Sequence, residues 1–303
     1  MHTLIYGTGA VGGYFGGRLA QGGGKVTFLA RGMQLTALSK AGLRVTSVDG
    51  DFAVKVNAVE NLSEVEDPDL VLLTVKAINT RTAAQDLAAN LPPGTMVMSL
   101  QNGIENVEIL AEALGAERVI AATVFIGANV AAPGVVRHTA AGFIRAGRYP
   151  EGSDPRILQV IKFLADKGLN IKETNDIRSD MWKKMLWNLG FNGPSALTGG
   201  TVGDMIARPG IAWLIRWLIA EGAQVARAAG VDMPEGVEDA TFAQTKGLND
   251  FKTSMLQDVE AGRRIENDPF YGFLSREGSR HGVSTPLTTM VRDALSLRYP
   301  NRA

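Results

Sequence analysis

Apolar runs and their polar interruptions divide the chain into a strand-rich first part and a helix-rich second part. The first run, residues 2–6, is short and leads through a glycine-rich turn into residues 10–20, whose composition suits a helix. After about Lys172 the strand-like runs stop, and helical periodicity continues to the end of the chain. Short apolar runs bounded by turns are typical of buried strands, whereas apolar spacings of three and four are typical of helices. The pattern predicts an α/β domain followed by an all-helical domain.

Further runs predict the other strands of the first domain. They cover residues 25–29, 70–75, 95–100, 119–130, 135–139 and 143–147. Residues 43–48 and 52–56 alternate around Asp49 and Gly50, which predicts a hairpin inserted beside the main sheet. The runs 119–130, 135–139 and 143–147 predict an antiparallel extension that closes the sheet. We place the boundary near residues 173–177, so that the domains are 1–174 and 175–303.

The composition narrows the class of protein. Lys plus Arg and Asp plus Glu each number 31 in 303 residues, so there is no basic excess for nucleic acid. The chain has no cysteine, which excludes disulfides and thiolate chemistry, and its three histidines have no metal-ligand spacing. A strand at residue 2 leaves no room for a signal peptide, and charges interrupt the most apolar late segment, residues 211–225. We therefore expect a cytoplasmic protein that binds no metal, membrane or nucleic acid.

The turn after the first strand is the first candidate site. Its G-x-G-x-x-G sequence consists of Gly7, Thr8, Gly9, Ala10, Val11 and Gly12. Gly7 allows the tight turn, Gly9 lets a pyrophosphate approach the backbone, and Gly12 lets the helix pack against the strand. The helix N-terminus then offers N–H groups to the phosphates. Between a strand and a helix, this sequence predicts dinucleotide binding; the alternative is a glycine-rich turn in another kind of α/β protein.

The end of the second strand bears on the identity of the dinucleotide. NAD-binding folds usually place an acidic residue there, about 20 positions beyond the glycines, whereas this chain has Ala30, Arg31 and Gly32. A guanidinium can bind a 2′-phosphate through two hydrogen bonds, so Arg31 favours NADP(H) over NAD(H) unless it is only a surface arginine. Lys76 and Asn102 follow two later strands, and ligands bind at the carboxyl ends of such strands. We expect both at the rim of the cofactor site, unless they are ordinary loop residues.

Residues 180–192 are the second informative stretch, and we expect them to form a buried helix. Lys184, Asn188 and Asn192 are spaced by four positions and share one helix face. Apolar side chains cover most of the remaining circumference, and an unpaired buried ammonium is too costly. This polar stripe should therefore face partners or a wet cavity, whereas Lys183 points elsewhere and should be solvated. The simpler interpretation is a set of hydrogen bonds between the domains.

With these landmarks the chain resembles the ketopantoate reductase (2-dehydropantoate 2-reductase) family over essentially its full length. The matching positions are the glycine-rich turn, Arg31, Lys76, Asn102-Gly103, the series Trp182, Lys184, Asn188 and Asn192, the run 254–258, and Glu266. The resemblance implies a Rossmann-type NADP-binding domain joined to a helical substrate-binding domain, as in 6-phosphogluconate-dehydrogenase-like proteins. It implies NADPH-dependent reduction of ketopantoate, or a closely similar branched 2-keto acid, as in pantothenate biosynthesis. A homodimer is compatible with it.

The resemblance also implies roles for individual residues. Lys184 would be the general acid that protonates the ketone oxygen, Asn188 and Asn192 would orient the substrate, and Ser254 would bind its carboxylate. Residues 7–12 would bind the cofactor together with Arg31, Lys76, Asn102, Glu266 and Ala128, the last of these past its strand end. Hydride addition develops negative charge on oxygen, which a positioned ammonium stabilises and protonates. An apolar cleft lowers the pKa of such a lysine toward neutrality.

Several positions depart from the family pattern on the substrate side. Gly193 separates Asn192 from Pro194, although Pro commonly follows the second Asn directly. Phe251 stands where Asn is frequent, and Asn267 and Tyr271 stand where Ile and Asn are more usual. These departures leave the identity of the keto acid open.

Simpler interpretations and other functions also stay open. Ser254 could be a helix-surface hydroxyl, and Glu266 could pair with Arg263 or Arg264. The chain could be an NADP-dependent hydroxy-acid dehydrogenase with a different substrate. It could instead be a non-catalytic NADP(H)-sensing regulatory protein, although a sensor needs no proton donor such as Lys184.

Overall fold

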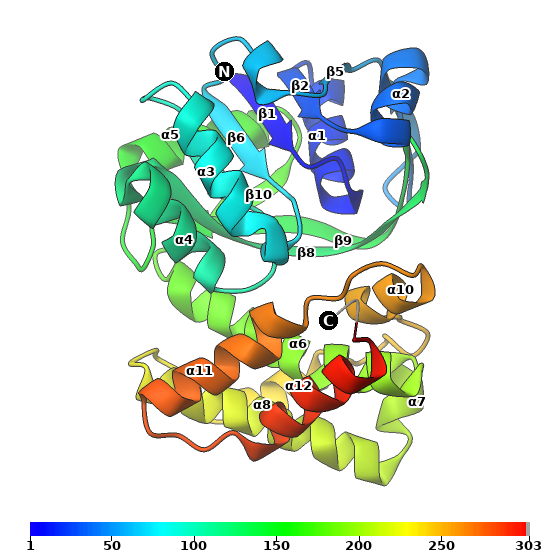
Figure 1. Cartoon of the computed structure of the whole chain (residues 1–303), viewed down its shortest axis with the longest axis vertical. Coiled ribbons are helices and arrows are strands. Elements are labelled where there is room, and N and C mark those ends of the chain that lie inside the picture. The colour runs from blue at the N-terminus through cyan, green and yellow to red at the C-terminus, as the bar shows by residue number, and fades with distance from the viewer. Residues whose placement is uncertain (301–303) are drawn as a thin grey trace. The chain divides into compact units, whose positions relative to one another are not determined.

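The computed structural model describes residues 1–300 and divides the chain into two compact units. The first unit comprises Met1–Asn102 and Asn106–Ile177, and the second comprises Gly103–Glu105 and the chain from Arg178 onward. All strands of the described chain belong to the first unit, and the second is built from helices (Figure 1). Among the described helices, none combines the length and the hydropathy that crossing a bilayer requires.

The first unit contains one ten-stranded sheet and its covering helices. The strands are β1 (His2–Tyr6), β2 (Lys25–Leu29), β3 (Leu43–Ser47), β4 (Phe52–Val54), β5 (Asn57–Val59), β6 (Leu70–Leu73), β7 (Met96–Ser99), β8 (Val119–Ala132), β9 (Val135–Gly147) and β10 (Asn170–Glu173). The helices are α1 (Ala10–Gln21), α2 (Gly32–Ala41), α3 (Thr80–Asn90), α4 (Glu105–Leu114) and α5 (Pro155–Asp166), with 3-10 turns η1 (Leu62–Glu64), η2 (Ala77–Asn79) and η3 (Ala116–Arg118). The strand order is β4-β3-β9-β8-β7-β6-β1-β2-β5, and β10 pairs with β9.

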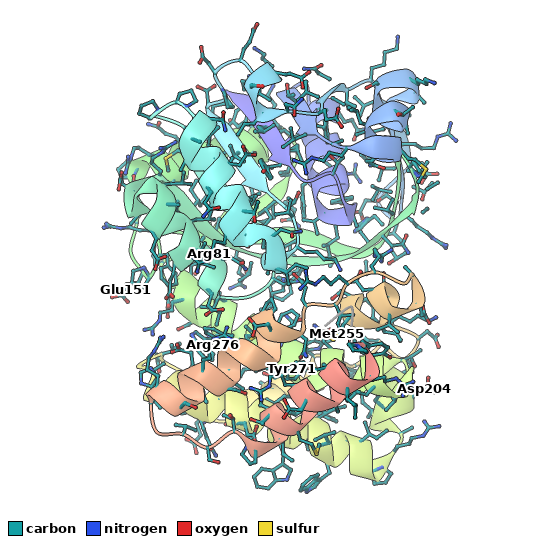
Figure 2. The ribbon with its side chains drawn as sticks, in the orientation of Figure 1. Arg81, Glu151, Asp204, Met255, Tyr271 and Arg276 are labelled. Atoms are coloured by element: carbon teal, nitrogen blue, oxygen red, sulfur yellow. The ribbon has the colours of Figure 1, made fainter. Side chains whose placement is uncertain are left out.

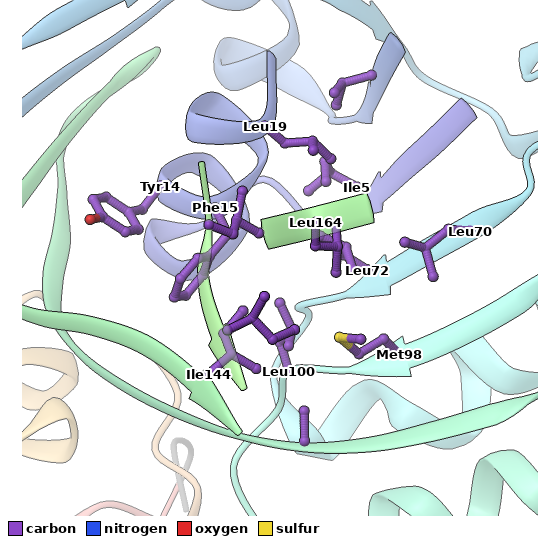
Figure 3. Packing of buried hydrophobic residues seen from close by; sticks show 14 of the residues in the cluster. Ile5, Tyr14, Phe15, Leu19, Leu70, Leu72, Met98, Leu100, Ile144 and Leu164 are labelled. Atoms are coloured by element: carbon purple, nitrogen blue, oxygen red, sulfur yellow. The ribbon is translucent and has the colours of Figure 1, made fainter. Parts of the chain in front are cut away.

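The centre of this sheet is parallel and buried. β1 lies between β2 and β6, β7 follows β6, and all three pairings are parallel. Every residue of β1, β6 and β7 is buried, because helices cover both faces of such a sheet and its strands can be apolar throughout. Figure 3 shows Ile5, Leu72 and Met98 of these strands in one cluster with Phe15 and Leu19 of α1. The predicted Rossmann-type arrangement is confirmed.

The predicted antiparallel extension is present as β8 and β9. The structure joins the two expected runs, 135–139 and 143–147, into the single strand β9, whose pairing with β8 shifts register at three places. One shift lies near Ala141, which has a positive φ of 58°. β3 pairs with β4 in an antiparallel hairpin around Asp49 and Gly50, as predicted, and joins the sheet through β9.

Two short strands carry too weak a pattern to be found from the sequence. β5 has three residues, none of them buried, and it extends the sheet beside β2. β10 has one buried residue, Ile171, between exposed neighbours. Both strands are specified by pairing with a partner that is distant in sequence, so their own composition does not reveal them.

The second unit is built around α6 (Ile177–Thr198). Its other helices are α7 (Val202–Ile206), α8 (Pro209–Ala228), α9 (Val237–Ala243), α10 (Ser254–Glu260), α11 (Phe273–Arg280) and α12 (Pro286–Arg298), with a π-helical turn, η4 (Asp268–Gly272). Trp182, Leu186, Leu189 and Phe191 of α6 are almost completely buried. This confirms that the helix carrying the polar stripe is a buried one.

A buried carboxylate ties α8 to the start of α12. Glu221 is 6% exposed and accepts hydrogen bonds from the backbone N–H groups of Leu287 (2.9 Å) and Thr288 (2.8 Å). The Thr288 hydroxyl donates a third bond to it at 2.7 Å. The first N–H groups of a helix have no intrahelical acceptor, and Thr285 at the N-cap makes no side-chain cap bond. Glu221, which in the sequence only interrupts an apolar run, therefore supplies the missing cap.

Candidate functional site

The turn after β1 is held by contacts that only glycine permits. Gly7 has a φ of 108°, and a Cβ there would lie 2.8 Å from both Cγ1 and the backbone nitrogen of Val75. A Cβ on Gly12 would overlap the Gly7 carbonyl oxygen and the Thr74 hydroxyl. That hydroxyl donates a hydrogen bond to the Gly7 carbonyl, which joins the turn to the end of β6. Strand, turn and helix are thereby packed as closely as backbones allow.

Gly9 has the opposite surroundings. A Cβ there would meet nothing within 4 Å, so the backbone borders open space. Gly9 is also the N-cap of α1, where no side chain makes a cap bond and the first turn carries no acidic residue. The N-terminus of a helix attracts anions through its N–H groups and its partial positive charge. The turn therefore suits the diphosphate of a dinucleotide.

A hollow of about 380 Å³ adjoins this turn within the first unit. Its lining residues are Tyr6, Gly7, Thr8, Leu29, Ala30, Arg31, Gln34, Val75, Asn79, Thr82 and Ala83. They follow β1, β2 and β6 and include one cation, Arg31, and no carboxylate. The hollow thus lies at the carboxyl ends of parallel strands, where ligands of such sheets bind.

Two polar side chains shape this hollow. The Gln34 amide donates to the Thr8 carbonyl at 3.1 Å and accepts from the Gly134 N–H at 2.9 Å. The Thr8 hydroxyl donates to the Leu29 carbonyl at 2.8 Å. These bonds connect the glycine-rich turn to the end of β2, where exposed Arg31 forms the N-cap of α2. Arg31 is thereby placed at the edge of the hollow.

The nearby carboxylate of Asp86 is already engaged. Tyr6 donates its hydroxyl to Asp86 at 2.6 Å. Burial, this hydrogen bond and the negative charge of Asp86 raise the pKa of Tyr6, and the charge of Arg31 opposes them. Tyr6 therefore keeps its proton and remains a donor to Asp86.

A buried polar network fixes the loops that carry Lys76 and Asn102. The Gln101 amide donates to the Val75 carbonyl (3.0 Å) and to the Thr80 hydroxyl (2.8 Å). Thr80 donates to Asn106 at 2.6 Å, and the Asn106 amide donates to the Asn102 carbonyl at 2.6 Å. Gln101 follows the buried strand β7 and carries a usable sequence signal, whereas Thr80 and Asn106 lie in helices and carry none. Lys76 and Asn102 are both partly buried.

Ala128 does not lie where the sequence placed it. We expected it past its strand end, but β8 continues to Ala132, and Ala128 pairs with His138 inside the ladder. The expected strand, residues 119–130, already contained Ala128, so its placement past the strand end was wrong; pairing with β9 also extends the strand beyond residue 130, although the side chains there are exposed. This position gives no independent support for cofactor binding.

In the second unit, α6 presents the predicted polar stripe. Asn188 and Asn192 are 7% and 0% exposed, and the Asn192 amide nitrogen lies 3.4 Å from the Asn188 amide oxygen. The Asn192 amide oxygen is buried and makes no hydrogen bond in the described chain. Buried polar atoms are nearly always hydrogen-bonded. An acceptor in this condition suits a ligand group that donates a hydrogen bond, or a bridging water.

Lys184 lies one turn before Asn188 on the same face. Its side chain keeps some exposed surface, yet loss of hydration lowers the pKa of its ammonium to about 8. The negative charge of Glu266 acts in the opposite direction and raises that pKa. The ammonium is thus more acidic than an ordinary lysine and is still mainly protonated near neutral pH.

The remaining candidates lie in the same unit. Ser254 is the first residue of α10 and is exposed, whereas Glu266 is partly buried just before η4. Glu266 interacts with Lys184, and Arg263 pairs with Asp258 at 2.8 Å. The sequence placed Glu266 on the cofactor side, and the structure gives it an electrostatic role toward Lys184.

Aromatic side chains flank Lys184 on the side opposite to the asparagines. Trp187 and Phe191 follow Lys184 by three and seven positions, which puts them on one flank of its face. Their rings stack at 5.0 Å, and Phe251 meets Trp187 edge-on at 6.1 Å. Ser254 follows Phe251 by three residues. In the sequence, Trp187 and Phe191 stand out only as apolar residues of the predicted buried helix.

Comparison with known proteins gives matches over both units. The family model described as ketopantoate reductase PanE/ApbA matches residues 3–151, and that described as ketopantoate reductase PanE/ApbA C terminal matches residues 176–298. The 2-dehydropantoate 2-reductase of Halobacterium salinarum is 32% identical over 299 residues, which cover 98% of each chain.

Solved structures agree with these matches. A PanE/ApbA family ketopantoate reductase from Ralstonia eutropha JMP134 superposes with a TM-score of 0.93 at 31% identity, covering 100% of this chain and 99% of the other. A D-mandelate dehydrogenase, solved with NADH and anilino(oxo)acetate, superposes with a TM-score of 0.92 at 23% identity, covering 99% of this chain and 98% of the other. The second likeness concerns the fold alone.

Proposed function

Because this chain belongs to the ketopantoate reductase PanE/ApbA family of oxidoreductases, we propose that it uses NADPH to reduce 2-dehydropantoate (ketopantoate), or a closely similar branched 2-keto acid, to the 2-hydroxy acid. The observation that carries the proposal is the Lys184 face of α6. An ammonium with a lowered pKa shares this face with two buried amides, one of which has an unpaired oxygen. This arrangement suits a substrate with a carbonyl that must be protonated. A protein that only senses the dinucleotide needs no such group.

We assign the two parts of the reaction to the two parts of the chain, residues 1–174 for the dinucleotide and 175–303 for the keto acid. Residues 7–12, Lys76 and Asn102 would hold the dinucleotide, with Arg31 on the 2′-phosphate. A guanidinium at the edge of a hollow without a lining carboxylate favours NADP(H), because a carboxylate there would accept ribose hydroxyls and repel a phosphate. When bound, the reduced nicotinamide supplies a hydride to the keto carbon.

Residues of the second unit would stabilise and protonate the ketone oxygen of the substrate. Negative charge grows on the ketone oxygen as the carbon is reduced, and the Lys184 ammonium stabilises it and transfers a proton to it. Asn188 and Asn192 would orient the substrate, and Ser254 would bind its carboxylate. Glu266 favours the charged form of Lys184, so its carboxylate helps to keep the acid loaded with its proton. Desolvation of the ammonium lowers its pKa, which makes it a stronger acid and eases proton transfer to the substrate.

A second candidate substrate is suggested by the aromatic flank. Trp187 and Phe251 are partly exposed and pack edge-on, with buried Phe191 stacked behind Trp187, and such ring surfaces suit an aryl or bulky apolar side chain. Ketopantoate carries a terminal hydroxyl, which needs a polar partner. The alternative is therefore a reductase of an aryl 2-keto acid that uses the same acid and the same cofactor.

The substrate prediction is tested with a panel of 2-keto acids. We expect kcat/KM, followed by the loss of NADPH absorbance, to be higher for ketopantoate than for phenylglyoxylate by about tenfold or more, because a site that hydrogen-bonds a substrate hydroxyl discriminates against an analogue without it. A preference of that size for phenylglyoxylate would establish the second candidate. The absence of turnover with every 2-keto acid would refute the proposed function.

The acid is tested with two neighbouring lysines. Lys184→Ala should lower kcat roughly 10²–10⁴-fold, the usual contribution of a positioned proton donor. Lys183→Ala is the matched control, because its side chain projects about 100° away around the helix, and it should be nearly silent. NADPH affinity should change little in both variants. If Lys184 only stabilised the fold, its removal would lower the melting temperature and leave turnover per folded molecule intact.

The cofactor preference is tested at Arg31. Arg31→Ala should weaken NADPH binding by about 1–3 kcal/mol, because charge-assisted hydrogen bonds to the 2′-phosphate are lost. NADH has no such phosphate, so its affinity should stay unchanged, and most of the difference between the two cofactors should disappear. The measurement is the dissociation constant of NADPH and of NADH, obtained by titration of the unmutated protein and of Arg31→Ala. Equal affinities for NADPH and NADH in the unmutated protein contradict the assignment.

A further inference from the structure

A side chain from η4 enters the turn of α6 formed by residues 189–193, which follows Asn188 and contains Asn192. In a regular α-helix the Gly193 N–H donates to the Leu189 carbonyl, one turn earlier. Here the Tyr271 hydroxyl accepts a hydrogen bond from the Gly193 N–H at 2.6 Å and donates one to the Leu189 carbonyl at 2.7 Å. The hydroxyl thus bridges two groups that would otherwise pair. Insertion of a side chain into the helical ladder is a recognised cause of local bending.

The residues around the Tyr271 hydroxyl leave space for it beside α6. Tyr271 is fully buried inside the second unit (Figure 2). A Cβ on Gly193 would overlap the Tyr271 hydroxyl and lie 2.5 Å from Cγ1 of Val291. The next residue, Pro194, has no N–H to continue the ladder, and its ring crowds the carbonyl one turn back. Burial raises the pKa of Tyr271, so the hydroxyl keeps its proton and serves as donor and acceptor.

The bridged turn adjoins the amide pair. Leu189 directly follows Asn188, and Gly193 directly follows Asn192, so each bridged group is the next neighbour of one asparagine. The distance between the Asn192 amide nitrogen and the Asn188 amide oxygen is 3.4 Å, at the long end for a hydrogen bond. The Asn192 amide oxygen makes no hydrogen bond within the described residues. The pair is therefore loosely joined, and the buried Asn192 oxygen keeps an unused capacity to accept a hydrogen bond.

We propose that Tyr271 is a positioning residue for the keto acid. Its hydroxyl holds the turn at residues 189–193 open and so keeps the Asn192 amide directed toward the substrate. Without the hydroxyl, the Gly193 N–H and the Leu189 carbonyl pair directly, the turn tightens, and the two amides close on each other. This inference rests on the proposed function, because it takes Asn188 and Asn192 as substrate-binding groups.

The test compares two tyrosine hydroxyls that both donate to carbonyls of α6. Tyr271→Phe removes the bridge, whereas Tyr299→Phe removes a bond of 2.7 Å to the Ala196 carbonyl, beyond the opened turn. We expect Tyr271→Phe to raise KM for the preferred keto acid about tenfold, to lower kcat by less than about threefold and to leave the NADPH dissociation constant unchanged. Tyr299→Phe should lower the melting temperature and leave KM unchanged.

A double variant shows whether the hydroxyl acts through Asn192. Tyr271→Phe added to Asn192→Ala should raise KM no further than Asn192→Ala alone, because coupled residues are not additive. An unchanged KM in Tyr271→Phe, or fully additive effects in the double variant, would overturn the inference and leave the proposed function standing.

A crystal structure of Tyr271→Phe separates this inference from the proposed function. We expect Gly193 N and Leu189 O to come within hydrogen-bond distance in that variant, and the amides of Asn188 and Asn192 to approach each other. If no member of a panel of 2-keto acids is reduced, the proposed function is refuted, whereas the crystal structure tests separately whether the Tyr271 hydroxyl holds the turn. If the turn keeps its geometry without the hydroxyl, the inference is wrong.

Discussion

The partial burial of the Lys184 ammonium on α6 is the constraint on which the arrangement of the second unit depends. Lys184 sits on a helix whose other faces are packed in apolar side chains, and a charge in such a place is stable only with partners. Glu266 supplies the opposing charge, and the asparagines continue the polar face along the helix. η4 begins two residues after Glu266, and its Tyr271 hydroxyl enters the same helix. One short segment, residues 266–271, therefore influences both the charge of Lys184 and the geometry of the amides beside it.

The first unit depends on a different constraint, the close approach of backbones at the glycine-rich turn. The Gly7 carbonyl and the Thr74 hydroxyl fill the space that a side chain on Gly12 would need, which locks β1, β6 and α1 together. Gly9 faces open space a few residues away. The same short sequence thus combines very close packing with an open stretch of backbone, and this contrast is what a diphosphate site requires.

The sequence predicted the parts of the fold whose pattern is local. Buried parallel strands are apolar throughout, and the α6 stripe follows from a spacing of four, so both were found. It missed β5 and β10, whose existence depends on distant partners, and it placed Ala128 outside a strand that in fact continues. Gly193 and Tyr271 were two unrelated departures from the family pattern in the sequence, and the structure joins them by a hydrogen bond. No single-chain pattern shows that a hydroxyl 78 residues away enters a helical turn.

The central claim, that Lys184 supplies the proton, is tested most directly by the pH dependence of kcat for keto-acid reduction in the unmutated protein and in Glu266→Gln. Only the ammonium form donates, so kcat should be level at low pH and fall about tenfold per pH unit above the pKa of Lys184. That pKa is about 8, and the charge of Glu266 raises it, so the midpoint should move to lower pH when the carboxylate is neutralised. A profile that is flat through this range, or a midpoint that moves upward in Glu266→Gln, would contradict the assignment of Lys184 as the acid.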